Sequence, residues 1–198
     1  MNILEKEMNT HAEKITMTID ELAKEFASKK HQGQKRKTGE DYITHPIAVA
    51  EILFKYKKSL HIDRLMAAAY LHDVLEDTDT TYYELISVFG YDVASIVKEL
   101  TNNENMKKAL GKATYLSYKL KEMSSWALTI KLCDRLHNVS SLNGTSESFK
   151  RNCIEETIII INYICQNRKL SQTHKVIIRD INIAIRSLGL EKERMVLK

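Results

Sequence analysis

Four titratable residues crowd one short stretch near the middle of this 198-residue chain, namely His72, Asp73, Glu76 and Asp77. The second pair follows the first by four positions, so in a helix both pairs lie on one face, one turn apart. Neighbouring carboxylates repel one another unless a cation or bound protons relieve the repulsion. Because imidazole together with carboxylate suits manganese, iron or zinc, the stretch predicts a divalent metal site.

A structural role for His72 is the competing interpretation. The imidazole lies on the apolar face of a predicted helix that follows Asp63, in register with Leu65 and Ala69. A single histidine in such a place is more often a hydrogen-bonded core residue than a ligand. A buried histidine beside a buried aspartate is nevertheless costly unless something satisfies both. The second acidic pair, one turn later, favours the metal site.

A second polar anomaly lies further along the chain, where Asp134 and Asn138 share one face of an otherwise apolar helix. The alternative is a solvated surface pair between Asp134 and Arg135, which contributes about 0–1 kcal/mol. Taken alone, the two interpretations are equally good. His45 precedes Pro46 at a predicted helix start, where the missing N–H of proline costs nothing, and by itself it marks only that boundary.

Helices dominate the predicted organisation, because one Pro and six Gly leave few interruptions. The expected helices begin near Thr18, His45, Asp63, Thr81, Val93, Ser125, Phe149 and Ser171. Gly90 is expected to end the short helix that begins at Thr81, and the polar stretch 102–111 is expected to be a mobile loop. These elements predict an all-α bundle in a single domain.

Composition excludes several classes of protein. A net charge of +4 without a basic stripe of interleaved aromatics argues against a nucleic-acid binder. The three cysteines, Cys133, Cys153 and Cys165, form no Cys-x-x-Cys pair, which argues against a disulfide framework or zinc ribbon and favours a reducing cytoplasm. No apolar run approaches the roughly 20 residues of a membrane helix, so we expect a soluble protein without a membrane partner.

Three segments, 33–46, 69–78 and 131–138, closely resemble the hydrolase domain of RelA/SpoT homologues, within the HD phosphohydrolase superfamily. They read GQKRKTGEDYITHP, AYLHDVLEDT and KLCDRLHN and occur in the family's order. The resemblance runs from about Ile19 to Thr157. No other stretch resembles the synthetase or regulatory domains of the long family members, so a small, stand-alone hydrolase with an HD-type helical bundle is expected.

The resemblance implies a role for each matching residue. Four match the family's metal ligands, usually to manganese: His45, His72, Asp73 and Asp134. Two match the acidic pair beside the attacking water: Glu76 and Asp77. Five match positions that hold the base and phosphates of the nucleotide: Arg36, Lys37, Thr38, Asn138 and Ser141. Arg151 belongs to a weaker downstream pattern with Glu156 and Thr157, which implies one further substrate contact.

The other histidines are not expected to be ligands. His31 and His137 recur in the family's segments as structural residues, whereas His11, His61 and His174 are expected at the surface.

The implied activity is manganese-dependent hydrolysis of the 3′-pyrophosphate of guanosine tetraphosphate or pentaphosphate, which yields GDP or GTP and pyrophosphate. An HD phosphohydrolase acting on another nucleotide such as NADPH is one alternative, and a non-catalytic nucleotide-binding module is another. The expected domain covers residues 18–190, between an N-terminal extension, 1–17, and a C-terminal tail, 191–198. The expected partner is a small nucleotide, and the oligomeric state is left open.

Overall fold

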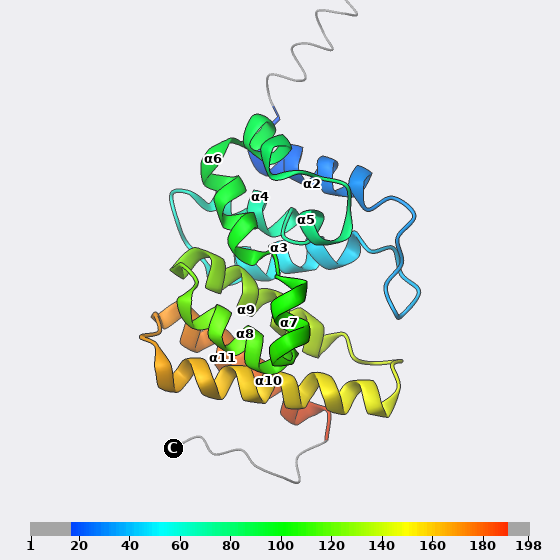
Figure 1. Cartoon of the computed structure of the whole chain (residues 1–198), viewed down its shortest axis with the longest axis vertical. Helices are drawn as coiled ribbons and strands as arrows, with labels where there is room; N and C mark the ends of the chain where they lie inside the picture. The colour runs from blue at the N-terminus through cyan, green and yellow to red at the C-terminus, as the bar shows by residue number, and fades with distance from the viewer. Residues whose placement is uncertain (1–16, 190–198) are drawn as a thin grey trace, which may run out of the picture.

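The computed structural model describes residues 17–189, and this part of the chain consists of helices and loops without a β-strand (Figure 1). The helices are α2 (Ile19–Lys30), α3 (Thr44–Tyr56), α4 (Ile62–Tyr70), α5 (Val74–Asp77), α6 (Tyr82–Leu100), α7 (Glu104–Leu110), α8 (Lys112–Glu122), α9 (Ser125–Ser140), α10 (Glu147–Asn167) and α11 (Gln172–Ser187). The all-α prediction is confirmed. The predicted N-terminal extension and C-terminal tail lie outside the described residues, apart from Met17.

Helix α9 forms the centre of the core and packs against α3, α6 and α11. Helices α8 and α10 pack against each other, and α2 and α3 both pack against α4 (Figure 1). Every residue from Ala127 to Leu136 is buried, including the charged Lys131, Asp134 and Arg135. Burying a charge is costly unless the charge is paired, so these three charged residues indicate a candidate functional site within the core.

The predicted helix after Asp63 ends at Tyr70, before it reaches His72. The His72 Nδ1 donates to the carbonyl of Ala69 at 2.8 Å. In a continuing helix that carbonyl would accept the backbone N–H of Asp73. The imidazole therefore replaces a backbone donor at the helix end, and the chain turns there before the single helical turn α5 begins.

Two glycines with positive φ shape the chain beyond α5. Gly90 (φ 78°, ψ 168°) interrupts the helical geometry, as expected of a helix end, but a second helical segment follows at once and α6 continues. The prediction of a loop at 102–111 is wrong, because α7 occupies most of it. Asn103 caps α7 by accepting the N–H of Met106, and Gly111 (φ 76°) ends it. Helix α7 has no buried residue, and its few apolar side chains are exposed, so its helical signal in the sequence was weak.

The starts of α9 and α11 are both capped by side chains. Helix α9 begins at Ser125, and Ser124 caps it, since its Oγ accepts the N–H of Ala127 at 3.2 Å. His174 is buried at the start of α11, so the prediction that it lies at the surface is wrong. Between residues 17 and 189, no helix is both long and apolar enough to cross a membrane.

Candidate active site

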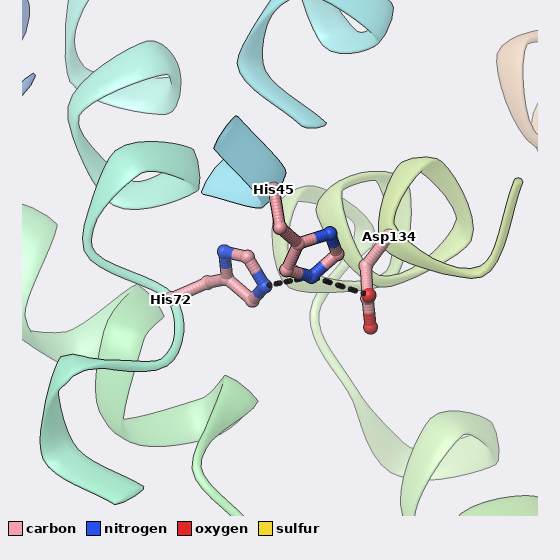
Figure 2. A group of neighbouring side chains, drawn as sticks. All are labelled: His45, His72 and Asp134. Carbon is pink, nitrogen blue, oxygen red and sulfur yellow. Dashed lines mark hydrogen bonds and ion pairs between the residues drawn. The ribbon is translucent and has the colours of Figure 1, made fainter. Parts of the chain in front are cut away.

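Side chains from three distant segments converge beside α9. His45 comes from the first turn of α3, His72 from the turn before α5, and Asp134 from the buried middle of α9 (Figure 2). One potential ligand atom from each of the three lies within 4.8 Å of the others. All three residues are at most 4% exposed, so they form a cluster inside the protein and not on its surface.

Asp73 completes this cluster. Its Oδ2 lies 3.0 Å from the Nε2 of His72 and 3.7 Å from the Nε2 of His45. The Nε2 of His45 lies in turn 3.2 Å from the Oδ1 of Asp134 and 3.3 Å from the Nε2 of His72. The structure therefore brings all four predicted ligands to one point.

Hydrogen bonds behind the two imidazoles determine which ring nitrogen faces this point. The His72 Nδ1 donates to a backbone carbonyl, as described above, which leaves Nε2 directed inward. The Nδ1 atoms of His45 and His137 lie 2.8 Å apart, and the Nη1 of Arg36 lies 3.3 Å from the same His137 nitrogen. Because arginine can only donate, His137 accepts, and the proton of the shared bond lies on His45. The Nε2 of His45 then carries an unprotonated lone pair, as the Nε2 of His72 does.

The state of His137 agrees with this arrangement. Burial is the largest cause that lowers the pKa of His137, to about 4, and the Arg36 guanidinium lowers it further. A neutral imidazole is the form that can accept a hydrogen bond at Nδ1.

The cluster has the electrostatic character of a cation site. In these tautomers two Nε2 lone pairs face each other beside two carboxylates, with no proton between them. Without a metal ion, protonation has to relieve the repulsion among these lone pairs and carboxylates. Burial by itself would lower the pKa of His72, but the adjacent Asp73 carboxylate raises it to about 9. Two imidazoles and two carboxylates form a donor set that manganese, iron or zinc accepts, so the residues present fit a divalent ion.

Lys131 is a residue of this site that the sequence did not single out. Its Nζ lies 2.7 Å from the Oδ2 of Asp134, and both side chains are buried. Asn138 donates from Nδ2 to the other carboxylate oxygen at 2.6 Å. Burial opposes ionisation of Asp134, but the ammonium and the nearby imidazoles hold its pKa well below the usual range. The carboxylate is thus charged and held from both sides.

The alternative of a solvated Asp134–Arg135 pair is wrong, because both residues are buried. The Arg135 Nη1 pairs instead with the Oε1 of Glu156 on α10 at 2.8 Å. Lys112 approaches the second oxygen of that carboxylate at 3.0 Å. These three charges join α8, α9 and α10 along one wall of the site.

The acidic pair of α5 is held by two residues that the sequence did not single out. The hydroxyl of Tyr42 lies 2.6 Å from the Oδ2 of Asp73 and 2.9 Å from the Oδ2 of Asp77, so it links a predicted ligand to the predicted acid. Asn102 donates to both oxygens of Glu76, from its backbone N–H at 2.7 Å and from Nδ2 at 3.1 Å. Tyr42 stood within a family segment, whereas Asn102 lay in the stretch predicted as a loop.

A cavity of about 590 Å³ opens over this cluster. The predicted residues that line it are Arg36, Lys37, Thr38, His45, Asp73, Glu76, Asp77, Asp134, Asn138 and Ser141. Arg151 does not line the cavity and is exposed on α10. Lys107 and Lys112, from α7 and α8, add cationic side chains to the lining. A cavity with cationic walls beside a metal-type cluster is suited to a substrate that carries phosphate groups.

Comparison with known proteins identifies the family. A family model described as HD domain matches residues 23–168. A guanosine-3′,5′-bis(diphosphate) 3′-pyrophosphohydrolase of Danio rerio, MESH1, is 39% identical over 134 residues, which cover 66% of this chain and 73% of that protein. The bifunctional (p)ppGpp synthase/hydrolase SpoT of Escherichia coli K12 is 34% identical over 166 residues, which cover 81% of this chain but 22% of SpoT.

A solved structure described as a metazoan orthologue of SpoT that hydrolyses ppGpp has the same fold. It superimposes with a TM-score of 0.72, at 23% identity, and the match covers 88% of this chain and 97% of the other. The family match, the all-helical fold and the buried His-His-Asp cluster agree with one another. The chain therefore belongs to the HD domain family, and within it is a phosphohydrolase related to MESH1 and SpoT.

Proposed function

We propose that this protein hydrolyses the 3′-pyrophosphate of guanosine tetraphosphate and pentaphosphate, giving GDP or GTP and pyrophosphate. The activities for which its relatives MESH1 and SpoT are named support this substrate. The observation that carries the proposal is the meeting of three features in one cavity. They are the four-residue cluster, whose His45, Asp73 and Asp134 line the cavity, the acidic pair of α5 and the cationic residues Arg36 and Lys37.

The metal ligands in this proposal are His45, His72, Asp73 and Asp134, and the preferred ion is Mn²⁺. When bound there, a divalent ion lowers the pKa of a coordinated water and neutralises negative charge on phosphoryl oxygens. Lys131 and Asn138 keep the Asp134 carboxylate ionised and oriented, through the bonds described above. This protein scaffold is in place before substrate arrives, which is what electrostatic preorganisation requires.

Glu76 and Asp77 are the proposed general acid–base pair. Both line the cavity next to Asp73, and each is held by a defined partner: Glu76 by Asn102 and Asp77 by Tyr42. A carboxylate in such a position orients the attacking water and takes its proton, an effect that typically contributes about 10²–10⁴-fold to rate.

The remaining proposed contacts recognise the nucleotide. Arg36 uses the edge of its guanidinium to bond His137 and Ser141, at 3.3 and 3.2 Å, so its planar face is the part left to stack on a purine. The Nζ of Lys37 lies 3.9 Å from the centre of the Phe149 ring, which holds this ammonium on the cavity wall. Lys37 and Thr38 then serve as donors to phosphate oxygens.

The test is release of pyrophosphate from guanosine tetraphosphate by the purified full-length chain with and without Mn²⁺. Asp73→Ala provides the inactive control, and Asp79→Ala is the matched active control because Asp79 is exposed and pairs only with Lys30. No release above the Asp73→Ala background would reject the substrate. Turnover of NADPH or another nucleotide alone would reassign the substrate. Tight nucleotide binding without any turnover would indicate a binding module.

A further inference from the structure

The junction between α6 and α7 contains a side chain that bridges two oppositely charged groups. The Oδ1 of Asn102 accepts from the Nζ of Lys119 at 3.1 Å, while its Nδ2 donates to Glu76. The backbone N–H of the same residue donates to the other oxygen of that carboxylate. One asparagine therefore provides two of its donors to Glu76 and its acceptor to a lysine.

The two partners leave one orientation of the amide. An ammonium group can only donate, and an ionised carboxylate can only accept. Asn102 must therefore present its oxygen to Lys119 and its nitrogen to Glu76. An aspartate of the same shape has no side-chain donor for Glu76, so only the amide satisfies both side-chain partners.

Lys119 anchors this bridge to the rest of the fold. Its Nζ also donates to the carbonyl oxygens of Leu100 and Thr101, at the C-terminal end of α6. These carbonyls are groups that a helix end leaves unpaired, and a cation is favourable there. Glu76 belongs to α5 and Lys119 to α8. The side-chain amide of Asn102 is therefore bonded to two helices at once.

Glu76 itself has little local support. It lies on α5, a helix of four residues in which only Val74 is buried. Such a helix does not stabilise itself in water, so the direction of the Glu76 carboxylate depends on what holds it from outside.

We infer that Asn102 is a positioning residue that orients the Glu76 carboxylate for the proton transfer proposed above. The inference rests on the proposed function for the role of Glu76. The same junction begins α7, which has no buried residue and brings Lys107 to the cavity. Asn102 therefore links the orientation of Glu76 to the start of the helix that carries Lys107 to the cavity.

Kinetics of Asn102→Ala on guanosine tetraphosphate provide the first test. We expect kcat to fall about 10- to 100-fold, the usual effect of losing an orienting partner, with KM and manganese content unchanged. Asn102→Asp should lose at least as much, because a carboxylate cannot donate to Glu76. Asn105→Ala, an exposed change on α7, should retain the native rate. Native kcat in both Asn102 variants would overturn the inference, as would a loss confined to KM.

Coupling to Glu76 separates positioning from a general structural effect. In a Glu76→Gln background, Asn102→Ala should lower the residual rate less than twofold, because the group it orients is gone. A full 10-fold further loss would contradict the inference. Amide hydrogen exchange of the Asn102 N–H, followed in Glu76→Ala, should accelerate at least about tenfold. That measurement needs no turnover, so it distinguishes a missing Asn102–Glu76 bond from a wrong substrate.

Discussion

The predicted metal centre and the start of α11 both bury histidine, but they treat the ring nitrogens differently. At α11, His174 is 1% exposed, its Nε2 donates to the carbonyl of Ser125 at 3.1 Å, and its Nδ1 accepts the N–H of Ser171 at 3.3 Å. Protein partners satisfy both nitrogens of that ring. In the cluster, the Nδ1 atoms of His45 and His72 bond to neighbouring protein groups, whereas the two Nε2 atoms face each other and share two carboxylates.

Burial alone therefore does not separate a structural histidine from a ligand. The useful criterion is what the second ring nitrogen faces. In His174 it faces a neutral backbone carbonyl, and the ring closes a capping interaction at the start of α11. His45 and His72 point their remaining lone pairs toward two carboxylates, an arrangement that a cation would stabilise.

The largest expected effect comes from Asp134→Ala, which removes a proposed ligand. We expect turnover to fall by about 10³-fold or more, because metal catalysis supplies several kcal/mol. The variant should also be less stable, since Lys131 would be left buried without its partner. Pyrophosphate release and bound manganese measure the loss, and far-UV circular dichroism checks that the helices survive. A near-native rate with manganese still bound would remove Asp134 from the ligand set.

Removing the metal is expected to have the next largest effect. At a free Mn²⁺ concentration of about 100 Kd, binding stabilises the folded state by about 2.7 kcal/mol. For a chain of this length that corresponds to a rise in Tm of roughly 5–10 °C. His174→Gln should show the same manganese-dependent rise, whereas His72→Gln should show none. Thermal scans with Mn²⁺ and with a chelator measure it, and equal shifts in both variants would invalidate the comparison.

The smallest expected effect is the pH dependence of stability at His174. Burial lowers its pKa in the folded chain from 6.5. As the pH falls through that value, the unfolded chain takes up a proton that the folded chain does not, so the free energy of unfolding decreases. One such group contributes at most about 1.4 kcal/mol per pH unit. By urea unfolding, the difference in the free energy of unfolding between wild type and His174→Gln should be smaller at about pH 5.5 than at about pH 7.5. An equal difference at both pH values would contradict this.

The sequence predicts those parts of the molecule where the spacing of nearby residues reflects which side chains are buried or brought together. The all-α class follows from apolar spacing and scarce breakers, and the matching segments predict that His45, His72, Asp73 and Asp134 lie together. Their role as ligands remains the prediction that the first experiment tests. A weaker pattern predicted Arg151 as a substrate contact, and the structure does not bring it to the cavity.

The missed features depend on contacts that a local pattern does not carry. Helix α7 buries nothing, so its sequence reads as polar loop. His174 lies among polar residues in the sequence, and its ring is buried where its Nε2 donates to the carbonyl of Ser125, 49 positions earlier in the chain. Lys131 did leave a signal, since a lysine three residues before Asp134 inside an apolar helix needs a buried partner.

The lack of buried residues in α7 means that the fold should tolerate substitutions on this helix. Substitutions on α7 remove nothing from the core, so most of them should change the free energy of unfolding by no more than about 0.5 kcal/mol. Lys107 nevertheless faces the cavity from that helix. Substitutions on α7 are therefore expected to change the charge of the cavity wall at little cost in stability, while the cluster beside α9 stays unchanged.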